Sequence, residues 1–282
     1  MCVILCMYDE HLITIRTIRS YCDSPFAYRT VKGVSGPSLL STRRFLVTGG
    51  ARGLGAAIVR RLAAHGADGA IIDLHEGAGD LPWPIVRADV TDETAMFDAT
   101  SALAADHGPF DGLVAAAGIV PPWQGPADVD LDVLDRTMAV NLRGFVLAVK
   151  CLAPAMPAGS TIVAIGSLNS WRGDPNLLAY AASKHAVLGV VRSSAMALGP
   201  SGIRVNAVAP GPIATDALLA RIDARAEATG RTRDEALHES AGLTALGRLA
   251  TEDDVADAVL YLSSPLSSAT TGHLIPVDSG LL

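Results

Sequence analysis

The sequence has little that would mark a nucleic-acid-binding or membrane protein. Its 282 residues carry a formal net charge of −7, and the pI is about 5.4. An acidic chain has no general electrostatic attraction for a nucleic-acid backbone or an anionic membrane surface. No uninterrupted apolar run approaches the roughly 20 residues that a membrane-spanning helix needs. We therefore expect a cytoplasmic protein that binds neither nucleic acid nor membrane.

The cysteines and histidines also lack the patterns of metal and hydrolase sites. Cys2, Cys6 and Cys22 fall near the start of the chain and Cys151 stands alone, with no C-x-x-C spacing. The chain has no H-E-x-x-H motif, in which two histidines one helical turn apart bind zinc, and no G-x-S-x-G motif of a serine hydrolase. The sequence therefore predicts no metal site and no disulfide framework, and it argues against hydrolysis.

Residues 1–43 differ in composition from the rest of the chain. They lack both a helical period and the alanine and glycine richness that follows. Their apolar start has no basic residues before it and is followed by Asp9 and Glu10, so a secretory signal fits poorly. Arginines further on would suit a mitochondrial presequence, but the acidic residues count against one. We predict a disordered N-terminal extension over residues 1–43 and one domain over residues 44–282.

From residue 44 onward, short apolar runs alternate with segments of helical spacing. The runs predict strands at residues 45–48, 69–73, 84–88, 111–115, 161–165, 203–208 and 271–277. Helical spacing or capping signals appear at residues 56–66, 91–106, 130–156, 178–198 and 251–264. Strands that alternate with helices form parallel sheets. We predict an α/β fold with a single doubly wound, Rossmann-like domain, a seven-stranded parallel sheet and a lid at about residues 212–245.

A glycine turn joins the first predicted strand to the first helix. Gly49, Gly53 and Gly55 have the spacing G-x-x-x-G-x-G, with Arg52 and Leu54 between them. Glycine permits a tight turn and lets the backbone approach a pyrophosphate, toward which the positive end of the helix points. A purely structural turn is the alternative interpretation. The position between strand and helix favours dinucleotide binding.

Acidic residues end the next two predicted strands. Asp73 follows Gly55 by 18 residues, close to the spacing at which a carboxylate binds the adenosine ribose; a helix cap or turn is the alternative. Asp89, followed by Val90, could accept a hydrogen bond from the adenine amino group or cap the next helix. Because the carboxylate of Asp73 would repel a 2′-phosphate, we predict NAD rather than NADP, although Arg52 favours NADP.

A tyrosine and a lysine on one predicted helix have the residue types of a proton-transfer site. Tyr180 and Lys184 are four residues apart, so both side chains leave the same face. Ser167 follows the strand at residues 161–165, where side chains point into the ligand crevice of α/β proteins. A phenol beside an ammonium is acidified by the charge, and a serine can hold the reacting oxygen. An ordinary half-exposed helix pair is the alternative for Tyr180 and Lys184.

Several motifs, taken together and in order, resemble those of the short-chain dehydrogenase/reductase family. They are the segments TGGARGLG, AAAG, NLRG, YAASK and PGPIAT, with Ser167 ahead of YAASK. Two departures are AAAG where the family usually has N-N-A-G, and VDSG near the end where the family usually has VDGG. The resemblance spans residues 44–282. It implies an oxidoreductase that transfers a hydride between NAD(H) and a secondary alcohol or ketone.

The resemblance also implies roles for individual residues. Asn141, Ser167, Tyr180 and Lys184 would form the catalytic tetrad. Ser167 orients the substrate oxygen, Tyr180 exchanges its proton, and Lys184 acidifies Tyr180 and holds the nicotinamide ribose. Asn141 anchors a proton-relay water. The cofactor-binding residues would be Gly49, Arg52, Gly53, Leu54, Gly55, Asp73, Asp89, Val90, Gly118, Tyr180, Lys184, Pro210, Ile213 and Thr215.

The segments expected around the substrate are mainly apolar. Their apolar side chains are Trp123, Leu168, Trp171, Leu177 and Leu178, with Asn169 or Asn176 as polar contacts. Trp123 either lines the substrate mouth or fills a loop. This composition predicts a small cyclic or short-chain alcohol rather than a phosphorylated substrate.

The same resemblance allows alternative functions and predicts an oligomeric state. An NADPH-dependent ketone reductase and a non-catalytic dinucleotide-sensing protein are alternative functions, because one fold supports several activities. The small residues of the helix at residues 178–198 include Ala179, Ala182 and Ala186, which allow helices to approach closely. Together with the family resemblance they predict a homotetramer.

Overall fold

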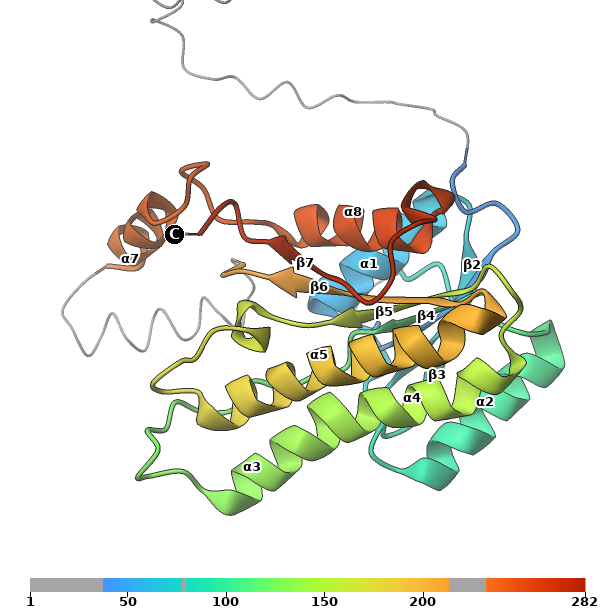
Figure 1. Ribbon diagram of the computed structural model, residues 1–282, viewed down its shortest axis with the longest axis horizontal. Coiled ribbons are helices and arrows are strands. Elements are labelled where there is room, and N and C mark those ends of the chain that lie inside the picture. The colour runs from blue at the N-terminus through green and yellow to red at the C-terminus, as the bar shows by residue number, and fades with distance from the viewer. Residues whose placement is uncertain (1–37, 78–79, 214–231, 282) are drawn as a thin grey trace, which may run out of the picture. The chain divides into compact units, whose positions relative to one another are not determined.

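The structure is a computed structural model that describes residues 38–77, 80–213 and 232–281 (Figure 1). Contacts divide the chain into two units, Met1–Pro37 and Ser38–Leu282, and all described residues belong to the second. Most of the expected N-terminal extension and part of the expected lid therefore lie outside the described residues.

One seven-stranded sheet forms the centre of the second unit. Its strands lie in the order β3-β2-β1-β4-β5-β6-β7, and every pairing is parallel. Their bounds are β1 (Arg44–Thr48), β2 (Asp68–Asp73), β3 (Ile85–Arg87), β4 (Gly112–Ala115), β5 (Thr161–Ile165), β6 (Arg204–Pro210) and β7 (Leu274–Val277). The order reverses between β1 and β4, which is where such sheets open a ligand crevice. The predicted doubly wound α/β fold with seven parallel strands is confirmed.

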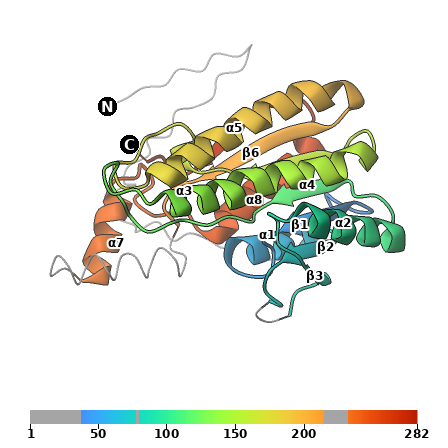
Figure 2. The same ribbon diagram turned by 90° about the horizontal axis from the view of Figure 1, so that it is seen from below.

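Helices cover both faces of the sheet (Figures 1 and 2). One face carries α1 (Gly53–Ala64) and α8 (Glu252–Ser263). The other carries α2 (Glu93–His107), α4 (Gly144–Leu152) and α5 (Leu178–Leu198). Two further helices are α3 (Leu131–Met138), which precedes α4, and α7 (Arg233–Gly242), which falls within the expected lid.

Each face of the sheet has its own apolar core. Side chains alternate between faces along a strand, so Leu46 packs with α2, α4 and α5, whereas Val47 packs with α1 and α8. The same alternation holds for Ile162 and Val163 in β5. Burial on both faces explains why these strands are continuously apolar in the sequence.

The packed unit begins six residues before the domain start expected from the sequence. Leu40 is fully buried beside α1, and its N–H donates to His65 O at 3.0 Å. Arg43 donates through its guanidinium to the carbonyl oxygens of Ser263, Asp111 and Gly159. Residues 38–43, which the sequence assigned to the extension, therefore pack with the second unit, Ser38–Leu282. The expected domain bounds stay a prediction.

A π-helical turn interrupts the long helix expected at residues 130–156. This turn, η1 (Ala139–Arg143), joins α3 to α4, and Gly144 N–H donates five residues back to Ala139 O. It contains Asn141, which is buried. Single π turns inside α-helices are rare and occur frequently at functional sites.

The same helical region passes a simple test for membrane spans. Among the described residues, Leu131–Ala155 is long and apolar enough to cross a membrane by length and composition alone, with a mean hydropathy of 1.4. Phe145, Ala148 and Leu152 from this stretch pack in the core between helices and sheet. Because a helix in the core of a soluble protein can have the same length and apolar composition, this stretch is weak evidence for a membrane span.

We predict that Ser279→Gly stabilises the protein by about 0.5 to 1 kcal/mol. Ser279 has a φ of 57°, a left-handed conformation that costs a residue with a Cβ about 1 to 2 kcal/mol but costs glycine little. Thermal or urea unfolding measures the change in unfolding free energy. Ser268→Gly is the matched control, because Ser268 has a φ of −56° and its replacement should destabilise. Equal destabilisation by both changes would contradict the prediction.

Candidate active site

A cavity of about 1140 Å³ opens at the carboxyl ends of β1, β2 and β4. It lies at the point where the strand order reverses. Nine of the predicted cofactor-binding residues line it, namely Gly49, Arg52, Gly53, Leu54, Gly55, Asp73, Asp89, Val90 and Gly118. These nine residues come from four separate stretches of the chain, which the fold brings together around one cavity.

The glycine turn between β1 and α1 leaves a helix end available to an anion. Gly49 and Gly53 have φ values of 71° and 51°, which favour glycine. A Cβ on Gly55 would lie 2.0 Å from Gly49 O, so the turn folds tightly against the helix. Arg52, the N-cap of α1, makes no side-chain capping bond, and the first turn has no acidic residue. The uncapped start of α1 and its positive helix end therefore suit a phosphate.

Asp73 is held at the end of β2 by backbone hydrogen bonds. Its Oδ2 accepts from Ala51 N–H and its Oδ1 from His75 N–H, both at 3.0 Å. The side chain is buried at the cavity wall. Each carboxylate oxygen has a second lone pair, so Asp73 can also accept hydrogen bonds from hydroxyl groups.

Asp89 makes a local turn at the end of β3. Its Oδ1 accepts from both the N–H and the Oγ1 of Thr91, each at 2.8 Å. The N-cap of α2 is instead Asp92, whose side chain accepts from Ala95 N–H. The helix-capping alternative for Asp89 is therefore wrong, and Asp89 remains a residue of the cavity wall beside Val90.

Lys184 and Tyr180 lie on one face of α5, close to the end of β5. The Lys184 ammonium lies 5.6 Å from the centre of the Tyr180 ring and donates to Ile165 O at 2.7 Å. Only 5% of Lys184 is exposed. Burial lowers the pKa of Lys184 from its ordinary value of 10.5 to about 8. The charge at this position is therefore costly in the absence of a compensating group.

Ser167 lies two residues beyond β5 and is buried. Its hydroxyl accepts from Asn169 N–H at 3.2 Å, which starts a short 3-10 turn over Leu168–Ser170. This bond uses one lone pair of the Ser167 hydroxyl. Its proton and second lone pair can interact with another oxygen.

Asn141 connects the π turn to the loop after β4. Its Oδ1 accepts from Ile119 N–H at 2.7 Å, and its Nδ2 donates to Ile119 O at 2.9 Å. The same Nδ2 donates to Ser183 Oγ at 3.0 Å, and Ser183 Oγ donates to Tyr180 O at 2.8 Å. The Asn141 side chain thus positions both the cavity wall and the helix of Tyr180.

Ser183 is a residue of this network for which the sequence reading assigned no role. It is fully buried inside YAASK, between Tyr180 and Lys184. A serine on the buried side of an apolar helix needs a hydrogen-bond partner, and this was the available signal. Its partner Asn141 lies 42 residues earlier, which the sequence pattern does not show.

Gly118 lies where these groups meet. A Cβ on Gly118 would stand 3.2 Å from Asn141 Oδ1 and 3.7 Å from Lys184 Nζ. The end of β4, the π turn and α5 therefore converge at this point. The small residues Ala116, Ala117 and Gly118 leave the adjacent part of the cavity open.

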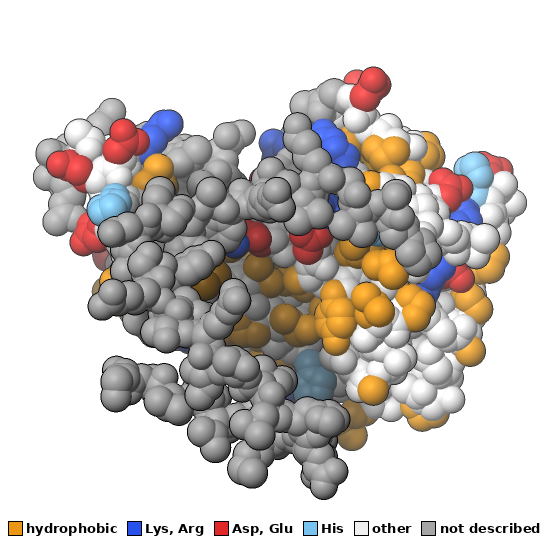
Figure 3. Space-filling view, turned by 90° about the horizontal axis from the view of Figure 1, so that it is seen from above, with side chains coloured by type: hydrophobic (Ala, Val, Ile, Leu, Met, Phe, Trp, Pro, Cys, Tyr) orange, Lys and Arg blue, Asp and Glu red, His pale blue; other side chains and the backbone are white. Residues whose placement is uncertain are grey.

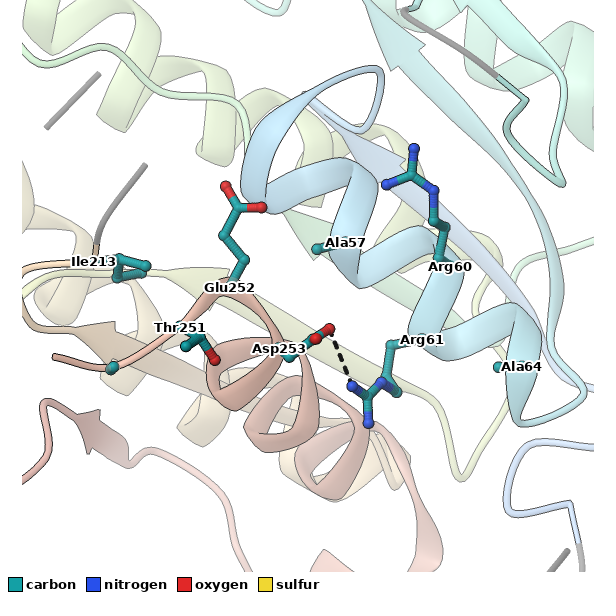
Figure 4. Close-up of a pocket in the computed structure, with 9 residues that line it drawn as sticks. Ala57, Arg60, Arg61, Ala64, Ile213, Thr251, Glu252 and Asp253 are labelled. Carbon is teal, nitrogen blue, oxygen red and sulfur yellow. Dashed lines mark hydrogen bonds and ion pairs between the residues drawn. The ribbon is translucent and has the colours of Figure 1, made fainter. Parts of the chain in front are cut away.

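Four other predicted cofactor-binding residues, Tyr180, Lys184, Pro210 and Ile213, are not among the described residues that line this cavity. Pro210 ends β6, and Ile213 lines a second, smaller cavity beside α1 and α8 (Figure 4). Thr215 lies outside the described residues, as does most of the segment between Ile213 and α7. Within the described residues, no group of three or more His, Cys, Asp or Glu side chains could hold a metal ion.

The loops expected around the substrate lie together. Gln124 N–H donates to Asn176 O at 2.8 Å, which joins the loop after β4 to the loop before α5. Trp123 and Trp171 are 48% and 42% exposed, so neither is a core residue. Leu168 is buried beside Ser167. The apolar substrate surroundings expected from the sequence stay a prediction.

Comparison with known proteins decides the family. A family model described as enoyl-(acyl carrier protein) reductase matches residues 49–282. Short-chain dehydrogenase reductase 5 of Arabidopsis thaliana is 37% identical over 246 residues, which cover 83% of this chain and 92% of that protein. The chain belongs to the short-chain dehydrogenase/reductase family. It is therefore an oxidoreductase of a family that uses nicotinamide dinucleotides.

Two further known proteins are similar to this chain over most of their length. Cis-4-hydroxycyclohexanecarboxylate dehydrogenase of Sinomonas cyclohexanicum is 37% identical over 246 residues, which cover 83% of this chain and 94% of that protein. The crystal structure of levodione reductase superposes with a TM-score of 0.78 at 29% identity, covering 85% of this chain and 97% of that one.

We predict that Lys184→Met stabilises the protein without dinucleotide by about 1 to 3 kcal/mol at pH 7. At pH 7 the lysine is charged in both states, so its full burial cost is present in the folded state. Between its folded pKa of about 8 and its unfolded value of 10.5, the unfolded chain binds more protons, and the stability of the unmodified protein rises with pH.

Urea unfolding at a series of pH values measures the difference in unfolding free energy between the methionine variant and the unmodified protein. This difference should shrink as the pH rises from about 8 to 10.5. A methionine variant that is less stable than the unmodified protein at pH 7 would show that the ammonium is not desolvated as we infer.

Proposed function

We propose that this protein interconverts a secondary alcohol and a ketone with NAD(H), and that Tyr180 is the general acid and base. The observation that carries this proposal is the buried ammonium of Lys184, 5.6 Å from the Tyr180 ring centre, near the end of the strand that precedes Ser167. An ammonium with little solvent around it favours a nearby phenolate.

The residues around the large cavity fit a nicotinamide dinucleotide. The glycine turn and the uncapped start of α1 suit its pyrophosphate, and Asp73 suits a ribose diol. Gly118 leaves room beside Lys184, which would hold the second ribose. When bound, the dinucleotide supplies the two-electron acceptor or donor of the reaction.

The proton of the reaction would move through Tyr180. An unperturbed tyrosine has a pKa near 10, and lowering it by about two units needs about 2.7 kcal/mol of preferential phenolate stabilisation. Lys184 is close enough to supply that stabilisation. In oxidation the Tyr180 phenolate accepts the proton of the alcohol hydroxyl, and in reduction the Tyr180 phenol donates a proton to the carbonyl oxygen.

Two other side chains would support this transfer. Ser167 can donate to the reacting oxygen and hold it near Tyr180. Asn141 positions the site through Ile119 and Ser183, both of which it bonds directly. Its role as the anchor of a relay water, expected from the family, stays a prediction.

We infer a small, mainly apolar substrate that contains a ring or a short chain. The loops that approach Ser167 contain Leu168, Trp123 and Trp171, with Asn169 and Asn176 as polar contacts. The name of the relative that acts on a hydroxycyclohexanecarboxylate supports a ring-bearing alcohol. The homotetramer and the cytoplasmic location stay predictions.

NAD is preferred over NADP in this proposal, although two side chains have opposite effects. Arg52 lines the cavity and would pair with a 2′-phosphate, which favours an NADPH-dependent ketone reductase as the second candidate function. Asp73 is buried and held by two backbone bonds, so it cannot move away from such a phosphate. At an effective dielectric constant near 20, two negative charges about 4 Å apart, such as Asp73 and a 2′-phosphate, repel by about 4 kcal/mol per charge pair. This repulsion outweighs the roughly 1 kcal/mol that an exposed ion pair with Arg52 would contribute.

Tyr180→Phe should lower turnover by about 10² to 10⁴ and leave dinucleotide affinity nearly unchanged. The change removes one hydroxyl and no carbon atoms of the ring. Nicotinamide absorbance with a panel of cyclic alcohols and ketones measures turnover, and fluorescence titration with NADH measures affinity. Near-normal turnover in the phenylalanine variant would contradict the assignment of Tyr180.

Asp73→Ala should narrow or reverse the preference for NAD over NADP. The variant removes the charge that opposes a 2′-phosphate and leaves Arg52 in place. The ratio of kcat/KM for the two cofactors measures the preference in both proteins. A higher kcat/KM with NADP than with NAD in the unmodified protein would mean that Asp73 does not lie at the ribose.

A further inference from the structure

One buried amide near Ser167 has no hydrogen-bond partner. The side-chain nitrogen of Asn169, Nδ2, is buried and makes no hydrogen bond within the part of the chain that the structure describes. Polar groups at the surface have water as a partner, and Figure 3 shows acidic and basic side chains at the surface of one face. Asn169 Nδ2 lacks that exposure. Because an unpaired N–H donor is costly when buried, this one suits an acceptor that a ligand supplies.

The main chain holds Asn169 directly against Ser167. Ser167 caps the 3-10 turn η3 (Leu168–Ser170), and its Oγ accepts from Asn169 N–H at 3.2 Å. This turn follows β5 at the carboxyl edge of the sheet, where the ligand crevice of such folds opens. Because an asparagine side chain is short, the amide of Asn169 stays close to the Ser167 hydroxyl. A molecule that contacts Ser167 can therefore also contact Asn169.

The other polar side chains of these loops have partners or contact solvent. Ser170 Oγ accepts from Ser167 N–H at 3.2 Å, which completes the capping box of the turn. Asn176, the second polar contact expected from the sequence, is exposed, so water can bind its amide. Of the two asparagines expected beside the substrate, Asn169 is therefore the one with a buried, unpaired donor.

The remaining buried side-chain atoms without a partner lie elsewhere. Among the described residues they are Ser160 Oγ, Thr161 Oγ1 and Ser263 Oγ. Ser160 and Thr161 stand at the start of β5, at the opposite end of this strand from Ser167, and Ser263 ends α8. Within the described part of the chain, Asn169 Nδ2 is thus the one such atom at the edge where a substrate would bind.

We propose that Asn169 Nδ2 donates a hydrogen bond to a second oxygen of the substrate, namely the carbonyl-type oxygen of an ester or a carboxylate near the reacting carbon. The proposal rests on the function proposed above, and it narrows the substrate to a ring or short chain with an oxygen acceptor in addition to the reacting alcohol or ketone. A hydrocarbon substituent in the same place would leave the donor buried and unpaired. A site that forms a hydrogen bond with its substrate rejects analogues that lack the partner group.

Matched pairs of ketones test the proposal. Methyl oxocyclohexanecarboxylates carry the acceptor, and cyclohexanones with a sec-butyl group at the same ring position have a similar shape without it. With NADH, the kcat/KM of the unmodified protein should be about ten- to hundredfold higher for the ester of the best pair. Equal values for the ester and the alkyl ketone in every pair would overturn the role of Asn169 and leave the proposed function intact. Turnover of neither ketone with NADH or NADPH would instead overturn the proposed function, and this inference with it.

Asn169→Leu removes the donor and keeps the approximate size of the side chain. It should bring the two kcat/KM values of a pair close together, and the Kd of NADH, measured by fluorescence titration, should stay the same. Asn176→Leu is the matched control, because it makes the same change at an exposed amide and should preserve the ratio of the two values. An equal fall of this ratio in both variants, or weaker NADH binding after Asn169→Leu, would overturn the assignment.

Urea unfolding separates this role from a structural one. Asn169→Leu should not lower the free energy of unfolding, because Asn169 Nδ2 has no partner in the described protein to lose. A clear loss of stability would show that the amide supports the turn, and it would overturn the proposal.

Discussion

The charge of Lys184 in the protein interior is the constraint on which the site depends. An ammonium that is 5% exposed needs oxygen partners, and Ile165 O at the end of β5 is one of them. This bond fixes α5 against the sheet and thereby sets where Tyr180 stands. The same burial lowers the pKa of Lys184, so the position is costly for folding and favourable for stabilising a phenolate. In the function proposed above, this lower stability falls at the position where proton transfer uses a poorly solvated cation.

The parallel sheet supplies the geometry that this charge requires. Because all seven strands run in one direction, their carboxyl ends gather the glycine turn, Asp73, Gly118 and Ser167 along one edge. Helices on both faces bury the strands, which leaves loops and helix starts as the parts that meet a ligand. The π turn then directs Asn141 toward Ile119 and Ser183, which ties the helical layer to that edge.

Local patterns predicted most of this arrangement from the sequence. The seven strands, the pair of Tyr180 and Lys184, and the nine cavity residues all follow from periodicity, turn chemistry and motif order. Contacts between distant segments could not be read in this way. The burial of Leu40 depends on the helix that ends at Ala64, and the bond between Asn141 and Ser183 depends on how two helices cross. The position of Asp92, rather than Asp89, as the cap of α2 is a local choice between similar acidic residues.

Two charged side chains with opposite effects lie at the cavity wall beside the glycine turn. Arg52 would attract a 2′-phosphate, whereas the buried carboxylate of Asp73 suits uncharged ribose hydroxyls. Arg52 is exposed and can turn toward solvent, but Asp73 is fixed by its hydrogen bonds from Ala51 and His75. In the function proposed above, the fixed carboxylate therefore determines which dinucleotide the site prefers, because a side chain that cannot move cannot relieve the repulsion of a 2′-phosphate.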